Sequence, residues 1–369
     1  MDGKAGASKR RAAVLGGLAL LLAGALLAGV LVGPTRLEPR QVLAGLLARP
    51  PAGAGAGQAN RAAPPGAAGP EAAGRAEAAA QAVIVREIRL PRVLLAALVG
   101  MALAEAGVAL QGLFRNPLAD PYVAGVSAGA ALGATVAFAL RGLSPARMDL
   151  PVPLLAFAGA LGTAELVWRL ARRGEGAPVP LLLLAGLAVS ALFSAAISVL
   201  MVVGQRQLGE VVFWLMGGLA GRGWSHVAAA LPAAALGTAL VAPRWRELNL
   251  LLFGEEEARY LGVEVARVQR RLQLGASLLA AAAVAVSGLV GFVGLVVPHL
   301  CRLLVGPDHR ALLPASLLAG GALAVLADLV ARTAFAPVEV PLGAVTALVG
   351  GPFFLFLLWR SGRGHGFVG

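Results

Sequence analysis

Three acidic residues lie inside long apolar stretches of the sequence, where a charged side chain is costly and usually functional. Glu165 and Asp328 each precede an arginine by four residues, Arg169 and Arg332, so a helix would place both carboxylates beside a basic partner. Glu105 has no such neighbour. These carboxylates therefore fit two kinds of chemistry: ion pairing inside a helix bundle, or proton or sodium binding in an ion-coupled secondary transporter.

The residues that nucleotide hydrolysis and metal catalysis require are missing. The only lysines are Lys4 and Lys9, so the sequence contains no GxxxxGK[ST] phosphate loop. None of the four histidines belongs to an HExxH motif, and Cys301, the single cysteine, cannot form a thiolate metal site alone. We expect no catalytic residue, no metal site and no cofactor bound by this chain, so the energy for any transport must come from elsewhere.

The composition indicates a membrane protein. Of the 369 residues, 58% are hydrophobic and only 14% are charged, whereas a soluble domain carries about 25% charged residues. The apolar residues form runs of about twenty, which is the length of a helix that crosses about 30 Å of hydrocarbon. We therefore predict an all-α membrane protein with ten transmembrane helices in a single domain, 1–369. The predicted spans are about 12–33, 91–113, 121–140, 151–170, 179–203, 226–243, 272–290, 294–305, 311–331 and 341–359, of which 294–305 is too short to cross alone.

The charge pattern predicts the orientation of the spans. The formal net charge is +12, and the basic residues lie at the ends of apolar runs, which does not resemble a nucleic-acid-binding surface. The positive-inside rule gives most weight to basic residues in short loops. It favours the orientation in which both termini are cytoplasmic, the loop 34–88 is outside and the segment 244–271 is cytoplasmic, with spans two to six in 89–243 and spans seven to ten in 272–360.

Two segments are too polar or too poor in large side chains to cross the membrane. Residues 50–80 are rich in alanine, glycine and proline, so we predict a flexible, disordered tract in the outer loop. In 244–271, three glutamates follow Gly254, which favours the start of a helix. Gly262 suits the end of that helix, and residues 263–271 suit a second one. The segment therefore predicts two short helices at the cytoplasmic surface.

Several long motifs in order resemble the FecCD family, the permeases of type II ABC importers for ferric siderophores, heme and cobalamin. The resemblance covers the chain from about Arg86 onward; the tract 50–80 and the carboxyl of Glu105 depart from the family pattern. The motifs are Arg89-Leu90-Pro91-Arg92, Gln111 to Pro121, Gly125 to Ala130, Gly291 to His299 with Arg302, Asp308-His309-Arg310, Ala327 to Arg332, and Glu339 to Thr346.

The resemblance implies a homodimer in the bacterial inner membrane, with two copies of an ABC ATPase that bind ATP and Mg²⁺, and with a periplasmic solute-binding protein. It implies that the short cytoplasmic helices contact the ATPase. It also implies that arginines at the outer face, Arg89, Arg92 and Arg332, dock the binding protein. The residues expected to couple to the ATPase are Gly254, Glu255, Glu256, Glu257, Ala258, Leu261, Gly262 and Val263.

The segment from Gln207 to Gly221 is the one that bears on the substrate. In the family this region forms a short helix near the outer mouth, and its Phe-Trp-x-Met-Gly pattern is similar to heme permeases, although cobalamin permeases have a related version. The expected pathway residues are Arg206, Phe213, Trp214, Met216 and Arg222. Heme is the expected cargo, with a ferric siderophore or cobalamin as the alternatives within the family. The alternative from another class is the ion-coupled secondary transporter.

Overall fold

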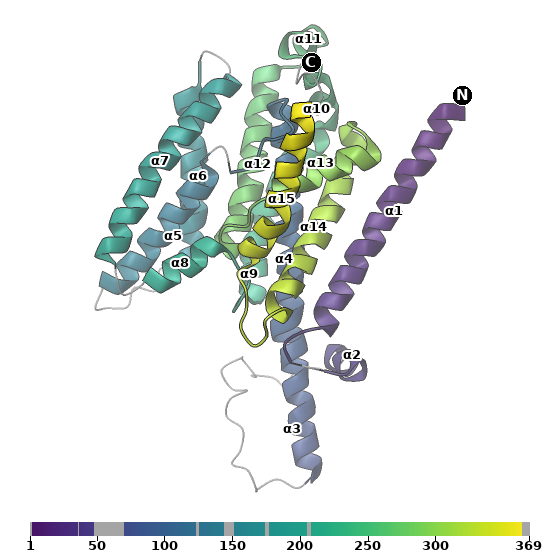
Figure 1. Cartoon of the computed structure of the whole chain (residues 1–369), viewed down its shortest axis with the longest axis vertical. Coiled ribbons are helices and arrows are strands. Elements are labelled where there is room, and N and C mark those ends of the chain that lie inside the picture. Colours follow the sequence, from purple (N-terminus) through teal and green to yellow (C-terminus); the bar gives the residue numbers. More distant parts are fainter. Residues whose placement is uncertain are drawn as a thin grey trace.

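Long apolar helices packed side by side make up the computed structural model (Figure 1). The structure describes residues 2–35, 37–47, 70–122, 125–143, 151–173, 177–204 and 208–363. These residues form helices and connections without a β-strand, which confirms the all-α prediction.

Each predicted span contains a helix of the structure. Six of the helical stretches are long and apolar enough to cross a membrane by themselves among the described residues. The predicted short stretch 294–305 is a helix of 13 residues, so the count of ten full spans stays a prediction. The corresponding helices are α1 (Asp2–Leu31), α4 (Leu90–Leu113), α5 (Val126–Leu143), α6 (Val152–Ala171), α7 (Val179–Val203), α9 (Trp224–Val241), α12 (Val265–Ser287), α13 (Val293–Val305), α14 (His309–Thr333) and α15 (Leu342–Arg363).

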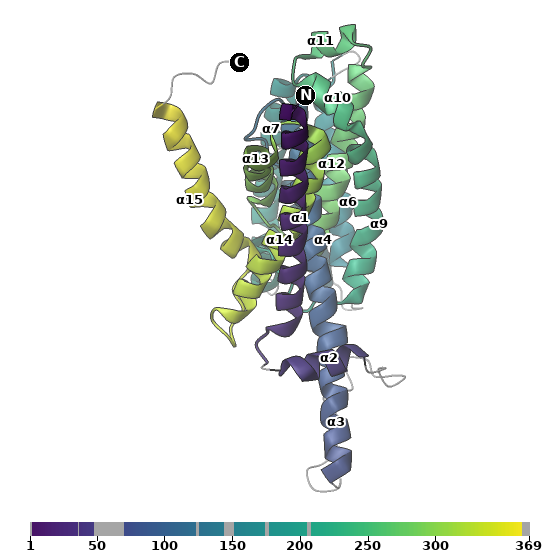
Figure 2. The same ribbon diagram turned by 90° about the vertical axis from the view of Figure 1, so that its right-hand side faces the viewer.

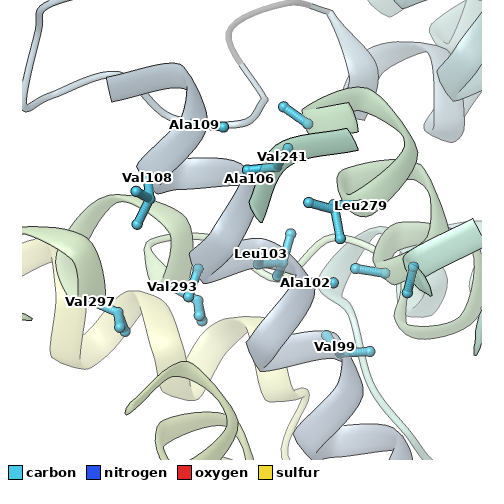
Figure 3. Packing of buried hydrophobic residues seen from close by; sticks show 14 of the residues in the cluster. Val99, Ala102, Leu103, Ala106, Val108, Ala109, Val241, Leu279, Val293 and Val297 are labelled. Atoms are coloured by element: carbon cyan, nitrogen blue, oxygen red, sulfur yellow. The ribbon is translucent and has the colours of Figure 1, made fainter. Parts of the chain in front are cut away.

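Helix α4 lies at the centre of the bundle. Its side chains pack against α9, α12 and α13, as Figure 3 shows for Leu103, Val241, Leu279 and Val293. Glycines allow its closest contacts: a Cβ atom at Gly107 would lie 1.9 Å from the carbonyl oxygen of Gly294. Small residues at such crossings are a common way to pack helices within a membrane.

Helices α5 and α6 pack in the same manner at one side of the bundle (Figure 1). A Cβ atom at Gly133 would lie 2.1 Å from the carbonyl oxygen of Leu155. The residues Gly125-Val126-Ser127-Ala128-Gly129 have the GxSxG spacing of a hydrolase nucleophile turn, but that turn requires a preceding strand. Here the five residues begin a helix that packs on another helix, so the spacing serves helix packing.

The loop 34–88, which we predict to be outside, contains more helix than the sequence suggested. Helix α3 (Pro70–Val83) continues through a π-helical turn, η1 (Ile84–Arg89), into α4, and the resulting rod extends beyond the bundle (Figures 1 and 2). The prediction of a disordered tract at 50–80 is therefore wrong for 70–80; the part before residue 70 lies outside the described residues. Alanine has the highest helix propensity and needs no burial to form a helix, which explains the difference.

The π-helical turn lies just before a proline. Pro91 has no N–H to donate and would interrupt a regular α-helix. Within the turn, the Leu90 N–H donates to the carbonyl of Val85, five residues earlier. The wider turn thus lets one continuous helix pass through the proline.

Two groups of elements define the ends of the bundle. The beginning of α1, the C-terminal end of α15, and the short helices α10 (Trp245–Leu251) and α11 (Glu255–Tyr260) lie at one end (Figures 1 and 2). Helices α2 (Pro39–Leu47) and α3 lie beyond the other end, and α8 (Leu208–Met216) lies nearer to that end (Figure 1). Helix α15 leans away from the other helices in Figure 2.

Candidate functional site

Helix α11 is bounded by two glycines in conformations that other residues rarely adopt. The φ angles are +132° at Gly254 and +86° at Gly262. The Gly262 N–H donates to the carbonyl of Arg259 at 2.9 Å, and the Val263 N–H donates to that of Ala258 at 2.9 Å. This pair of bonds is the Schellman ending of a helix. The predicted start and stop of the first short helix are confirmed.

The second short helix of this segment is α10 (Trp245–Leu251), which precedes α11, so the predicted location at 263–271 is wrong. Residues from Val265 onward form the first turns of α12, which continues to Ser287. No proline interrupts this stretch, and its buried face is continuous from Val268 through Leu272. The segment 244–271 therefore contains two short helices, α10 and α11, followed by the start of α12. Gln269 of α12 donates a hydrogen bond to Glu255 of α11 at 3.0 Å.

The surface of α11 is suited to contact another protein. Ala258 is buried, whereas Tyr260 is 91% exposed and Leu261 is 64% exposed. Phe253, just before α11, is also exposed. A cleft of about 1320 Å³ lies beside the helix, and Arg115 and Arg173 are among its lining residues. Exposed aromatic and aliphatic side chains grouped beside charged residues are typical of protein interfaces.

A second cavity, of about 480 Å³, lies beside α8 and contains three of the predicted pathway residues: Phe213, Trp214 and Arg222. The predicted short helix in this segment is confirmed. Met216 is half-exposed and is not a lining residue, and Arg206 lies outside the described residues.

Two nitrogen donors at this cavity have no partner among the described residues. They are Trp214 Nε1 and Arg222 Nε, both buried. Arg222 Nη1 lies 3.1 Å from Nε2 of His226, a residue that the sequence did not single out. Phe138 and Glu210 also line the cavity, so an acidic and a basic side chain are both present among its aromatic rings.

The three arginines predicted to dock a binding protein lie inside the fold. Arg92 binds Asp328 through Nη2 and Oδ1 at 2.9 Å and Glu339 through Nη1 and Oε1 at 2.9 Å. Arg332 lies 3.4 Å from the other Asp328 oxygen, and its Nη2 donates to the carbonyl of Gly29.

Arg89 donates to the carbonyl oxygens of Val30 and Leu31 at 3.1 and 3.0 Å and to that of Thr35. The bonds of Arg89 join η1 to the end of α1, and those of Arg92 and Arg332 join α14 to α4 and α1. All three arginines are buried, and carboxylates and carbonyl groups from distant parts of the chain surround their guanidinium groups. Their docking role stays a prediction.

The other two carboxylates have different surroundings. Glu165 accepts from Arg169 at 2.7 Å, which confirms the local pairing, and also from Arg270 of α12 at 2.5 Å. Glu105 is fully buried and accepts one hydrogen bond, from the Thr238 hydroxyl at 2.6 Å. Its Oε1 has no hydrogen-bond partner among the described residues.

A helical bundle with long apolar helices, a cavity near one end and a short protruding helix at the other has the architecture of a membrane permease. The chain belongs to the FecCD transport family, whose model matches residues 20–360.

Known relatives support this assignment along most of the chain. The chain is 50% identical to the cobalamin import system permease protein BtuC of Halobacterium salinarum over 75% of this chain and 73% of the relative. It is 47% identical to the hemin transport system permease protein HmuU of Yersinia pestis over 74% and 82%. A solved metal-chelate type ABC transporter in an inward-facing conformation is similar with a TM-score of 0.75 and 32% identity, covering 94% and 99% of the two chains. The chain is therefore a multi-pass permease subunit of an ABC importer, and a separate ATPase drives transport.

This assignment predicts little effect from neutralising Glu105. The Glu105→Gln variant is expected to transport within about twofold of the wild type, because the amide oxygen still accepts from the Thr238 hydroxyl. Uptake into proteoliposomes with the partner ATPase, at pH 6 and pH 8, checks the prediction. Uptake that an imposed proton gradient drives in the wild type, and that the variant loses, would contradict it.

Proposed function

We propose that this permease imports a flat, anionic metal chelate, with heme as the preferred cargo. The observation that carries the proposal is the cavity beside α8. Three aromatic residues, Phe138, Phe213 and Trp214, line it together with the charged residues Arg222 and Glu210. Its volume of about 480 Å³ lies within the range of small-molecule sites, about 300–1000 Å³.

The chemistry of these side chains suits heme. The rings of Phe213 and Trp214 can pack against a porphyrin face, and Arg222 can pair with a propionate carboxylate. Cobalamin and ferric siderophores remain the alternatives, and overall identity does not separate heme from cobalamin, because the two relatives are 47% and 50% identical to this chain.

The same proposal includes the partners. We infer a homodimer in the inner membrane with two copies of the ATPase and a periplasmic binding protein. The beginning of α1, the C-terminal end of α15 and α11 share one end of the bundle. We infer that this end is cytoplasmic, because the positive-inside rule favours cytoplasmic termini for this sequence. Helix α11, with its exposed Tyr260 and Leu261, is then the contact with the ATPase.

The identity of the substrate is tested by removing one aromatic ring and the guanidinium group from the cavity, each in a separate variant. Phe213→Ala and Arg222→Ala are each expected to lower ATP-driven heme uptake about tenfold, because each removes a contact worth about 1.5 kcal/mol. Uptake into proteoliposomes that contain the ATPase and the binding protein measures this, with cobalamin and a ferric siderophore as parallel substrates.

Phe335→Ala is the matched control, because Phe335 is an exposed aromatic residue that does not line the cavity. Heme uptake that stays at the wild-type rate in both cavity variants would refute the heme proposal. If cobalamin or the siderophore is taken up faster than heme, and both cavity variants lose that uptake, then that compound is the substrate that binds in the cavity.

A further inference from the structure

Helix α10 connects directly to α11 and is also bound to α14. The chain passes from Leu251, the end of α10, to Glu255, the start of α11, through three residues. Asn249 of α10 donates from Nδ2 to Asp308 Oδ1 at 2.9 Å, and its Oδ1 accepts from the His309 N–H at 2.9 Å. The same Oδ1 lies 2.8 Å from Nδ1 of the His309 ring, which is buried.

Asp308 extends this contact to the first helix. Its Oδ2 accepts from Arg11 of α1 at 2.9 Å, and its Oδ1 also accepts from the Arg310 N–H, as a helix N-cap does. Burial raises the pKa of the Asp308 carboxyl, but the hydrogen bonds from Asn249, Arg310 and Arg11 outweigh burial and hold the pKa below its usual range. Asp308 is therefore charged at neutral pH and binds all three elements at once.

The other end of α11 leads to a different part of the bundle. Gln269 binds Glu255, and one residue later Arg270 binds Glu165 of α6 at 2.5 Å. The two ends of α11 thus lead to separate helices: α10 to α14 and α1, and α12 to α6. The hydrogen bonds of Asn249 to Asp308 and His309 link α10 to α14, and Asp308 in turn binds Arg11 of α1.

We propose that Asn249 is a positioning residue for coupling, which passes the displacement of α11 to α14 and α1 through Asp308. An amide that donates with one atom and accepts with the other fixes both the distance and the orientation of α10, whereas apolar contacts between helices allow sliding. The inference rests on the proposed contact between α11 and the ATPase.

The test changes the amide of Asn249 to a carboxylate in the complete importer and then exchanges the two groups in a double variant. Asn249→Asp places two carboxylates against each other and is expected to lower the amount of substrate transported per ATP hydrolysed about tenfold. ATPase attachment and hydrolysis should stay near the wild-type level, because α11 itself is unchanged. The double variant N249D/D308N restores a donor and an acceptor between the two positions, so most of the coupling ratio should return.

Three measurements keep the outcomes separate: co-purification of the ATPase, ATP hydrolysis, and substrate uptake in proteoliposomes. Asn116→Asp is the control, since it makes the same chemical change at an exposed residue whose Oδ1 accepts from the Leu118 N–H. Asn249→Leu removes both bonds without adding a charge and should also lower the ratio.

A wild-type coupling ratio in N249D or in N249L would overturn the inference, and so would a double variant that binds the ATPase but stays as uncoupled as N249D. The proposed role of α11 is tested by another variant, Gly262→Pro. If Gly262→Pro blocks ATPase attachment while N249D transports normally, the inference fails and the role of α11 stands. If Gly262→Pro keeps both attachment and transport, the role of α11 fails.

Discussion

Replacing Gly262 with proline is expected to abolish ATP-driven uptake while the protein remains in the membrane. The residue has a φ of +86°, and its N–H donates to the carbonyl of Arg259. Proline fixes φ near about −65° and has no N–H, so both conditions for the end of α11 are lost. The helix would then present Tyr260 and Leu261 in a different direction. Uptake is expected to fall at least about 100-fold, because the contact with the ATPase depends on the direction in which these two side chains point.

Gly262→Asn is the matched control for this prediction. Asparagine adopts positive φ more readily than other residues with side chains and retains the N–H. A Cβ atom at this position meets nothing within 4 Å, so the asparagine should keep most of the uptake. The measurements are substrate uptake and co-purification of the ATPase with each variant. Normal coupled transport by the proline variant would show that α11 does not carry the ATPase contact.

The second large effect is expected on stability. Asp328→Ala removes the carboxylate that binds Arg92 and Arg332, both of which are buried. Breaking a buried ion pair by removing one partner costs about 3–5 kcal/mol, because the remaining charge has no compensation. Glu339 would still bind Arg92, but it is partly exposed, and one carboxylate would not compensate the charges of both guanidinium groups. The variant should unfold at a clearly lower temperature in detergent.

The comparison for Asp328 is a surface pair in the same chain. Glu264 binds Arg267 at 2.5 Å, but both side chains are more than 60% exposed, at 62% and 64%. Solvent screens such a pair, so Glu264→Ala should cost about 0–1 kcal/mol. Thermal unfolding of both purified variants, followed by the loss of monodisperse protein, checks the difference. Equal unfolding temperatures would mean that the buried cluster contributes little to stability.

Local patterns in the sequence predicted the elements near each functional residue. The glycines at 254 and 262 predicted the limits of α11, because the backbone angles of a helix end depend on the residue at that end. The spacing of Glu165 and Arg169 predicted their ion pair, because residues four apart share one face of a helix. Runs of apolar residues predicted the helices that form the bundle.

The wrong predictions concern segments whose local sequence is compatible with two different structures. An alanine-rich tract without large side chains reads as disordered when burial is the criterion, yet α3 forms there on propensity and on continuity with α4. The start of α12 reads as a short helix when charged residues are taken to end it, yet the helix continues to Ser287. In both cases the segment is part of a longer continuous helix, which its local sequence does not show.

The sequence by itself determined the class of protein: a helical membrane permease that lacks a nucleotide-binding motif and belongs to the FecCD family. Tertiary structure decided which partners each charged side chain has. Arg92 reaches Asp328 across 236 positions, and Asn249 reaches Asp308 across 59. Hydropathy and helix ends are set by residues within a few turns, whereas a contact between distant residues exists only after the helices between them have packed.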